Sequence, residues 1–205
     1  MKVAVVVLAA GSSRRLGRPK QLLPLHGRPL LQYAVDAASG SAADDVVLVL
    51  GHAAEEILAS VTLDPRVRTV RNPLHHEGQS TSLQSGLRAL DARVGVAIVV
   101  LGDQPLIQSW MIDRVIAVSL EGASPIVRSR FKGGASGHPV ALARSTWPAV
   151  LGVSGDVGAR DIMAANSHSV RDVELGVDPL RDVDTIADYE ELRADLDRPP
   201  SPPDE

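Results

Sequence analysis

The segment "KVAVVVLAAGSSRRLGRPKQLLP", residues 2–24, joins a valine-rich run to a loop that contains glycines and basic side chains. A continuous apolar run that stops at a glycine-containing loop is typical of a strand buried on both faces of a parallel sheet. Gly11 and Gly17 let the loop turn tightly and bring its backbone close to a ligand. We therefore expect a buried strand over residues 2–8 and a ligand-binding loop at its carboxyl end.

Strands and helices alternate in the first half of the chain. Further apolar, β-branched runs occupy residues 45–50, 66–70 and 96–101, and stretches with helical apolar spacing occupy residues 29–39, 53–61 and 80–90. Such an alternation predicts right-handed βαβ units with helices on both faces of the sheet. The expected fold class is α/β, a three-layer, Rossmann-like arrangement with a mostly parallel central sheet.

The second half is less regular. We expect helices over residues 108–120, 158–166 and 186–196, and strands over residues 124–131, 138–143 and 168–175. The chain ends in "LDRPPSPPDE", whose polar, proline-rich composition is typical of a disordered tail. No internal repeat or linker divides the rest, so we expect one domain over residues 1–195 and a tail over residues 196–205.

The composition narrows the classes of function. The chain has no cysteine, which excludes disulfides, thiolate metal sites and cysteine nucleophiles and favours a reducing, cytoplasmic location. A net charge of −4 argues against a nucleic-acid-binding surface. The first apolar run is short and is followed at once by basic residues, which favours a buried strand over a signal peptide. No apolar run approaches the ~20 residues that a membrane-spanning helix needs, so we expect no membrane partner.

The loop after the first strand carries positive charge in an otherwise acidic protein. Arg15 and Lys20 add full charges to the backbone amides of a glycine-hinged turn, a combination that suits a polyphosphate. The loop is not a Walker A sequence, because its glycines are six positions apart and Lys20 follows Pro19, and it lacks the dinucleotide pattern GxGxxG. A solvated turn is the alternative interpretation.

Asp103 directly follows the strongly apolar run at residues 96–101, so we expect it at the same sheet edge as the first loop. It could ligate Mg²⁺, which is usually held by one or two carboxylates plus substrate phosphates, or it could cap the following helix. Asp182 and Asp184 offer a second carboxylate, although one of them could cap the last helix; we favour Asp184 for the metal. The "HHE" sequence at residues 75–77 is expected to form a solvated turn.

The segment "LAAGSSRRLGRPKQLLPLHGRPLL", residues 8–31, resembles the signature of the MobA-like nucleotidyltransferases. The motifs "NPLHHEGQSTSLQSGL", "LGDQP", "GHPV", "GDVGAR" and "DVDTIADY" follow in the order found in the MocA-like branch, the molybdenum cofactor cytidylyltransferases. The resemblance extends from residue 2 to about residue 192. It implies the nucleotidyltransferase fold and Mg²⁺-dependent transfer of a nucleotide.

The resemblance also implies a role for each matching residue. The first motif would shape the nucleotide pocket through Leu8, Ala9, Ala10 and Gly11, and Arg15 and Lys20 would hold the triphosphate. Ser80, Thr81 and Ser82 would lie near the base or ribose, and Asp103 would bind Mg²⁺ with help from Asp184. His138, Asp156 and Arg160 would face the acceptor, although His138 could instead bond backbone and Asp156 could cap a helix. The "LAAG" sequence, where the guanylyl-transferring branch has "LAGG", favours CTP as donor.

The implied reaction moves CMP from CTP to the phosphate of molybdopterin or its molybdenum-loaded form, with loss of pyrophosphate. A phosphate monoester is largely ionised at pH 7, so this nucleophile needs no general base. Three alternatives stay open: GTP or another phosphorylated acceptor as partner, a maturation factor that passes the finished cofactor to a client molybdoenzyme, and a dinucleotide-dependent oxidoreductase. The positive loop counts against a maturation factor, which would not need to bind a triphosphate. The missing GxGxxG pattern counts against an oxidoreductase.

Overall fold

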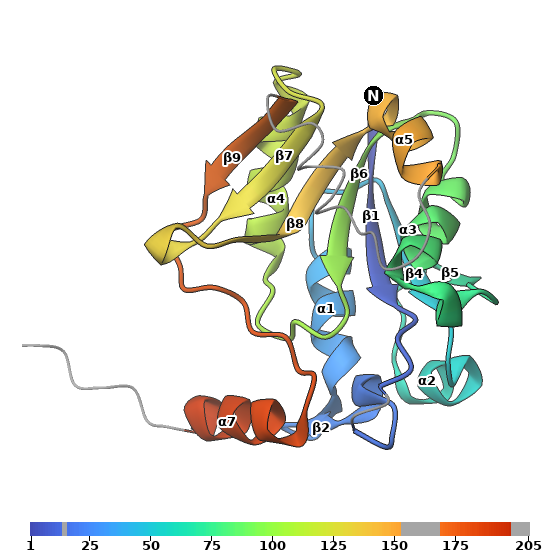
Figure 1. Ribbon diagram of the computed structural model, residues 1–205, viewed down its shortest axis with the longest axis vertical. Helices are drawn as coiled ribbons and strands as arrows, with labels where there is room; N and C mark the ends of the chain where they lie inside the picture. Colours follow the sequence, from blue (N-terminus) through green and yellow to red (C-terminus); the bar gives the residue numbers. More distant parts are fainter. Residues whose placement is uncertain (14–15, 153–168, 198–205) are drawn as a thin grey trace, which may run out of the picture.

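The computed structural model describes residues 1–13, 16–152 and 169–197. Its main sheet has seven strands: β1 (Lys2–Ala9), β4 (Asp45–Leu50), β5 (Val67–Arg71), β6 (Val94–Leu101), β7 (Ile126–Arg130), β8 (Ser136–Ala143) and β9 (Val170–Glu174). The strands lie in the order β5-β4-β1-β6-β8-β7-β9 (Figure 1). Only β8 runs antiparallel to its neighbours in this sheet, so the predicted mostly parallel sheet is confirmed.

Strand β1 lies in the middle of the sheet, between β4 and β6. Its central residues Val5, Val6 and Val7 are fully buried, as the continuous apolar run predicts. Leu8 pairs with Leu101 of β6 in parallel register. The loops that follow β1 and β6 therefore start side by side at one edge of the sheet.

Helices cover both faces of this sheet, and the predicted three-layer α/β fold is confirmed. The described helices on these faces are α1 (Leu30–Ser39), α2 (Ala54–Ser60), α3 (Gln79–Arg88), α4 (Ser109–Leu120) and α5 (Trp147–Leu151), whereas α7 (Ile186–Asp197) lies beyond the edge of the sheet. Val5 and Val7 share a buried cluster with residues of α1, α2 and α4. Ala4 and Val6, which point to the opposite face, share another cluster with residues of α3 and α5.

The C-terminal helix packs against the segment that follows the first loop. This segment contains the short 3-10 helix η1 (Lys20–Leu22) and a small hairpin of β2 (Pro24–Leu25) and β3 (Arg28–Pro29). Tyr189 and Leu192 of α7 share a buried cluster with Leu23 and Leu25, and the Tyr189 hydroxyl donates to the carbonyl oxygen of Pro24. Figure 1 shows α7 beside β2, beyond the carboxyl ends of β1 and β6. This packing brings the segment that precedes α7 to the same edge as the first loop.

The structure differs from the expected elements in a few places. Helix α5 was not predicted, and strand β8 starts at Ser136, two positions before the expected 138. Helix α7 continues to Asp197, beyond the expected domain end at residue 195. The expected helix over residues 158–166 and residues 198–205 of the expected tail lie outside the described residues. Among the described helices, none is long and apolar enough to cross a membrane.

Candidate active site

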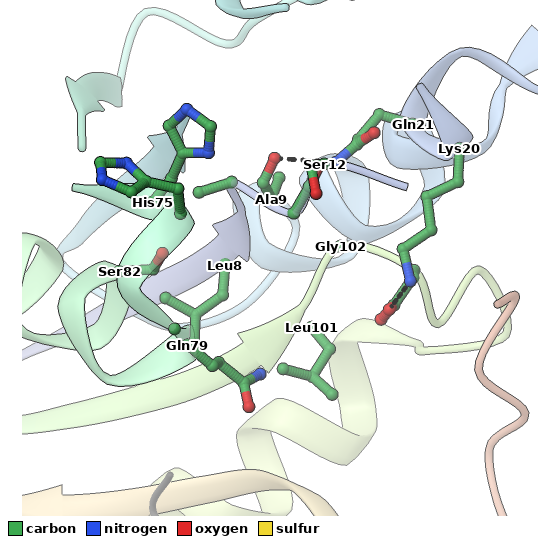
Figure 2. Close-up of a pocket in the computed structure, with 15 residues that line it drawn as sticks. Leu8, Ala9, Ser12, Lys20, Gln21, His75, Gln79, Ser82, Leu101 and Gly102 are labelled. Atoms are coloured by element: carbon green, nitrogen blue, oxygen red, sulfur yellow. Dashed lines mark hydrogen bonds and ion pairs between the residues drawn. The ribbon is translucent and has the colours of Figure 1, made fainter. Parts of the chain in front are cut away.

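A cavity of about 400 Å³ lies at the carboxyl ends of β1 and β6. Four segments line it: the end of β1 with the loop after it, η1, the start of α3 with the turn before it, and residues 101–103. Figure 2 shows Lys20 on one side of this cavity and His75, Gln79 and Ser82 on the other. The cavity thus has a charged side and a neutral polar side, and it lies where ligands bind in open parallel sheets.

The charged side is built by Lys20 and two carboxylates. The ammonium nitrogen Nζ of Lys20 lies 2.5 Å from Oδ2 of Asp103 and 2.7 Å from Oδ1 of Asp184. The Lys20 side chain is 13% exposed and that of Asp103 is 20% exposed. Burial alone would lower the pKa of Lys20, but the charges and hydrogen bonds of the two carboxylates outweigh it and raise this pKa above its ordinary value. The predicted meeting of Lys20 with Asp103 is confirmed.

The segment before α7 is fixed to this site by backbone and side-chain hydrogen bonds. The N–H of Val183 donates to the carbonyl oxygen of Asp103 at 3.1 Å. Helix α7 is capped by Thr185, whose hydroxyl accepts from the Asp188 N–H, while the Asp188 carboxylate accepts from the N–H groups of Thr185 and Asp184. The carboxylates of Asp182 and Asp184 are therefore not the caps of this helix, and each makes a different contact.

The two candidate carboxylates on this segment differ in their surroundings. Asp184 contacts Lys20, whereas Oδ1 of Asp182 accepts a hydrogen bond from Nε2 of Gln104 at 2.7 Å. Burial raises the pKa of Asp182, and the negative charges of Asp103 and Asp184 raise it further, against the opposing effect of the Gln104 hydrogen bond. Asp184 thus shares the Lys20 ammonium with Asp103, and its predicted role as second metal ligand stays a prediction.

The residues present fit a divalent metal ion. Oδ1 of Asp103 is buried and has no hydrogen-bond partner among the described residues, while Oδ2 faces the Lys20 ammonium. A buried carboxylate oxygen without a donor is suited to a hard cation, and Asp184 adds a second carboxylate. No group of three or more His, Cys, Asp or Glu side chains that could hold a metal occurs in the described part of the chain. The set is therefore typical of Mg²⁺ or Mn²⁺ sites that substrate phosphates complete.

The loop after β1 lines the cavity as predicted. Leu8, Ala9, Ala10 and Gly11 are all in its wall. Gln21, which the sequence analysis did not single out, also lines the cavity and is only 2% exposed. The predicted phosphate ligand Arg15 lies outside the described residues.

The start of α3 contributes fewer residues than predicted. Ser82 lines the cavity, but Ser80 and Thr81 do not belong to its lining. Ser80 is 1% exposed, and the Thr81 hydroxyl donates to the carbonyl oxygens of Leu74 and Gly78. Thr81 therefore bonds to the turn before α3, and among residues 80–82 the helical rotation of successive side chains brings only Ser82 to the cavity.

The turn at residues 75–77 is solvent-exposed, as predicted, and it also lines the cavity, which the sequence analysis did not predict. His75 and His76 begin the 3-10 helix η2 (His75–Glu77), none of whose residues is buried, and both line the cavity. The ring centroid of His75 lies 5.9 Å from that of His76 and 6.1 Å from that of His52. The sequence could not predict that these histidines line the cavity, because adjacent polar residues before a helix show no periodic pattern.

The predicted acceptor residues are only partly described. Strand β8 runs antiparallel to β6, so His138, near the start of β8, lies at the sheet edge where β6 ends and Asp103 follows. His138 is not part of the lining of the 400 Å³ cavity. Asp156 and Arg160 lie outside the described residues.

Comparison with known proteins assigns the chain to a family. Residues 5–171 match the MobA-like NTP transferase domain. The chain belongs to this family. It is 32% identical to nicotine blue oxidoreductase from Paenarthrobacter nicotinovorans over 197 residues, which cover 90% of this chain and 93% of the relative. It is 33% identical to the bifunctional protein GlmU of Kineococcus radiotolerans over 178 residues, 85% of this chain, but spans only 35% of that longer protein.

Solved structures agree with this assignment. The chain is 35% identical to the Rv0371c homologue from Mycobacterium sp. strain JC1, with a TM-score of 0.84 over 96% of this chain and 98% of the homologue. Rv0371c from Mycobacterium tuberculosis H37Rv in complex with manganese is 31% identical, with a TM-score of 0.81 over 95% of this chain and 99% of that protein. The family and the site together make this MobA-like chain a nucleotidyltransferase, an enzyme class that generally uses a divalent metal ion.

Proposed function

We propose that this nucleotidyltransferase transfers CMP from CTP to the terminal phosphate of molybdopterin or its molybdenum-loaded form, with Mg²⁺ as cofactor. The observation that carries the proposal is the contact of Lys20 with both Asp103 and Asp184 at one side of the cavity. The neutral side, with Ser82 and Gln79 at the start of α3, suits a base and ribose. The "LAAG" sequence at residues 8–11 supports cytosine over guanine.

In this proposal, Lys20 and the loop after β1 bind the triphosphate. The Lys20 ammonium offsets negative charge on the phosphates, and Arg15 adds a second positive charge. Backbone N–H groups of the loop after Ala9 donate to phosphate or base oxygens. Asp103 and Asp184 hold Mg²⁺, which when bound offsets the charge that develops on the departing pyrophosphate.

The reaction forms one P–O bond and breaks one. An oxygen of the acceptor phosphate bonds to the α-phosphorus of CTP, and the bond from this phosphorus to the β-phosphate bridging oxygen breaks, which releases pyrophosphate. The attacking phosphate is already ionised at pH 7, so no side chain needs to remove a proton. The protein must instead bring two anions together, and the positive charge of Lys20 at the cavity serves this purpose.

The acceptor is proposed to bind beside the CTP site. His138 lies at the same sheet edge as Asp103 and supports this placement. Asp156 and Arg160 are proposed to contact the acceptor phosphate or the turn around it. We also propose a cytoplasmic location and delivery of the product to a client molybdoenzyme, since the acceptor class is an intracellular cofactor precursor.

The test is a transfer assay with purified protein, molybdopterin, Mg²⁺ and each of CTP, GTP, ATP and UTP, followed by pyrophosphate release. We expect release with CTP that Asp103→Asn lowers at least about a hundredfold, since one charge contact in the transition state is worth ~3 kcal/mol. Asp91→Asn, a surface carboxylate paired with Arg93, is the matched control and should retain full activity.

Each other outcome overturns a defined part of the proposal. Pyrophosphate release with GTP alone would show that GTP, not CTP, is the donor. Release only with a different phosphorylated acceptor would show that molybdopterin is not the substrate. Tight binding of the finished cofactor without pyrophosphate release would indicate a carrier. Nucleotide-independent reduction or oxidation of a substrate, the reaction class in the name of one relative, would overturn the transferase proposal.

A further inference from the structure

Gln21 is a buried polar residue in the wall of the proposed nucleotide cavity. Its side chain is 2% exposed, and its amide nitrogen Nε2 donates to the carbonyl oxygens of Ala9 at 2.9 Å and Gly11 at 3.2 Å. We infer that Gln21 is a positioning residue, which holds the loop after β1 in the shape that binds the triphosphate. This inference rests on the proposed function in that it takes a nucleoside triphosphate as the ligand of the loop.

The two hydrogen bonds lie at the end of the sheet ladder and just beyond it. The ladder between β1 and its neighbours ends at Ala9, which pairs with Leu50 of β4. Beyond Ala9 the backbone is loop, and the Gln21 amide supplies donors to carbonyl oxygens on both sides of Ala10. Gln21 therefore fixes the backbone of the two residues that follow β1, Ala10 and Gly11.

This orientation has a consequence for the N–H groups. In a trans peptide, the C=O of one residue and the N–H of the next point in opposite directions. Because the carbonyl groups of Ala9 and Gly11 point toward Gln21, the N–H groups of Ala10 and Ser12 point away from it. All four of these residues line the cavity, and in this inference the N–H groups of Ala10 and Ser12 serve as an anion-binding pair.

The other end of the Gln21 amide connects the loop to Lys20. The Ser13 hydroxyl lies 3.5 Å from Oε1 of Gln21 and accepts a hydrogen bond from the backbone N–H of Lys20 at 3.0 Å. Ser13 adopts a φ of 50°, a left-handed conformation that a serine rarely takes without such support. Gln21 and Ser13 thus fix the distance between the loop amides and the base of the Lys20 side chain.

A second buried glutamine provides a matched control. Gln32 of α1 is 4% exposed, its Nε2 donates to the carbonyl oxygen of Thr62 at 2.8 Å, and its Oε1 accepts from the Thr62 N–H at 2.7 Å. Gln32 does not line the cavity. If Gln21 only stabilised the fold, its replacement would have the same consequences as replacement of Gln32.

The experiment compares Gln21→Met, Gln21→Glu and Gln32→Met with the wild-type chain. Methionine keeps the length of glutamine and removes its donors, whereas glutamate keeps the size and offers only acceptors to the two carbonyl oxygens. We expect the substitutions at Gln21 and at Gln32 all to lower the unfolding temperature by a few degrees. Only the Gln21 variants should raise the Kd and KM for CTP, about tenfold for methionine and more for glutamate, with kcat changed less than about threefold. The KM for the acceptor should stay unchanged.

A second measurement does not depend on the identity of the nucleotide. Hydrogen exchange of the amides in residues 9–13 should become about tenfold faster in Gln21→Met and stay unchanged in Gln32→Met. Unchanged exchange in this loop, or an equal loss of CTP affinity in the Gln21 and Gln32 variants, would overturn the inference. If the wild-type chain binds no nucleoside triphosphate, the proposed function fails, and with it the binding role of Gln21, while the exchange result still decides whether Gln21 orders the loop.

Discussion

The ammonium nitrogen of Lys20 lies 2.5 Å from Oδ2 of Asp103, although 83 positions separate the two residues in the sequence. The same nitrogen lies 2.7 Å from Asp184, so one positive charge is shared by two carboxylates. A divalent cation that binds these carboxylates has to compete with Lys20. A triphosphate offers the ammonium group a different partner, so nucleotide and metal are expected to favour each other's binding.

Replacement of Lys20 tests this competition. Without nucleotide, Lys20→Met should bind Mn²⁺ about tenfold more tightly than the wild-type chain, because the two carboxylates lose their internal cation. The measurement is a titration of free Mn²⁺ by electron paramagnetic resonance. A lower or unchanged Mn²⁺ affinity in Lys20→Met would mean that the carboxylates do not form the metal site.

The two carboxylates before α7 should differ in the same titration. Asp184→Asn is expected to weaken Mn²⁺ binding about tenfold or more, because Asp184 shares a cation with Asp103. Asp182→Asn should change it less than about threefold, since the Asp182 carboxylate is engaged by Gln104. The reverse order would assign the second metal ligand to Asp182.

The packing of α3 on the sheet leaves no room for a side chain at Gly86. A Cβ atom at this position would lie 2.4 Å from Cγ1 of Val6 and 3.1 Å from Cγ2 of Val49. Alanine gains about 1 kcal/mol of helix propensity over glycine, but overpacking costs about 1–3 kcal/mol. We therefore expect Gly86→Ala to lower the free energy of unfolding by up to about 2 kcal/mol in urea titrations.

Ser85→Ala, one position earlier on α3, is the control for this substitution. Ser85 is half-buried, and its hydroxyl donates to the carbonyl oxygen of Thr81 within the same helix. Its loss should leave the stability within about 0.5 kcal/mol of the wild-type value. A more stable Gly86→Ala protein would show that α3 does not pack as closely on Val6 as the structure has it.

Asp172 provides a test of pH dependence away from the cavity. Arg128 and Arg130 of β7 hold its pKa below the ordinary value through hydrogen bonds and charge. A carboxyl group whose pKa is lower in the folded state stabilises the fold above its unfolded pKa of about 3.9, and this contribution disappears as the pH falls through the folded pKa. Asp172→Asn should therefore lower the free energy of unfolding by about 0.2–1 kcal/mol at pH 7, and the difference should close as the pH falls below the folded pKa. A difference that does not depend on pH would exclude this electrostatic origin.

The parts of the fold that are buried on both faces were predictable from the sequence. The bounds of β4 (Asp45–Leu50) agree with the predicted strand because an apolar run ends there at a glycine. The meeting of Lys20 and Asp103 was also predictable, since parallel strands place the loops at their carboxyl ends along one edge. These features depend on periodicity and topology, which the sequence displays directly.

Other features depend on the path of the backbone through loops. The hydrogen bonds of Gln21 close a loop that contains the left-handed turn at Ser13, which no periodic pattern indicates. His75 and His76 reach the cavity because the turn before α3 is folded back by the Thr81 hydroxyl. Helix α5 has only five residues, too few to show helical spacing.

The most direct measurement of the central claim is a calorimetric titration of CTP into the wild-type chain and Lys20→Met, each with Mg²⁺ and with a chelator. If Lys20, Asp103 and Asp184 serve one metal-bound triphosphate, CTP binds the wild-type chain with Mg²⁺. Its affinity should then fall at least about tenfold on chelation and again in Lys20→Met. CTP binding that neither chelation nor the loss of Lys20 changes, or the absence of binding by any nucleoside triphosphate, would contradict the account.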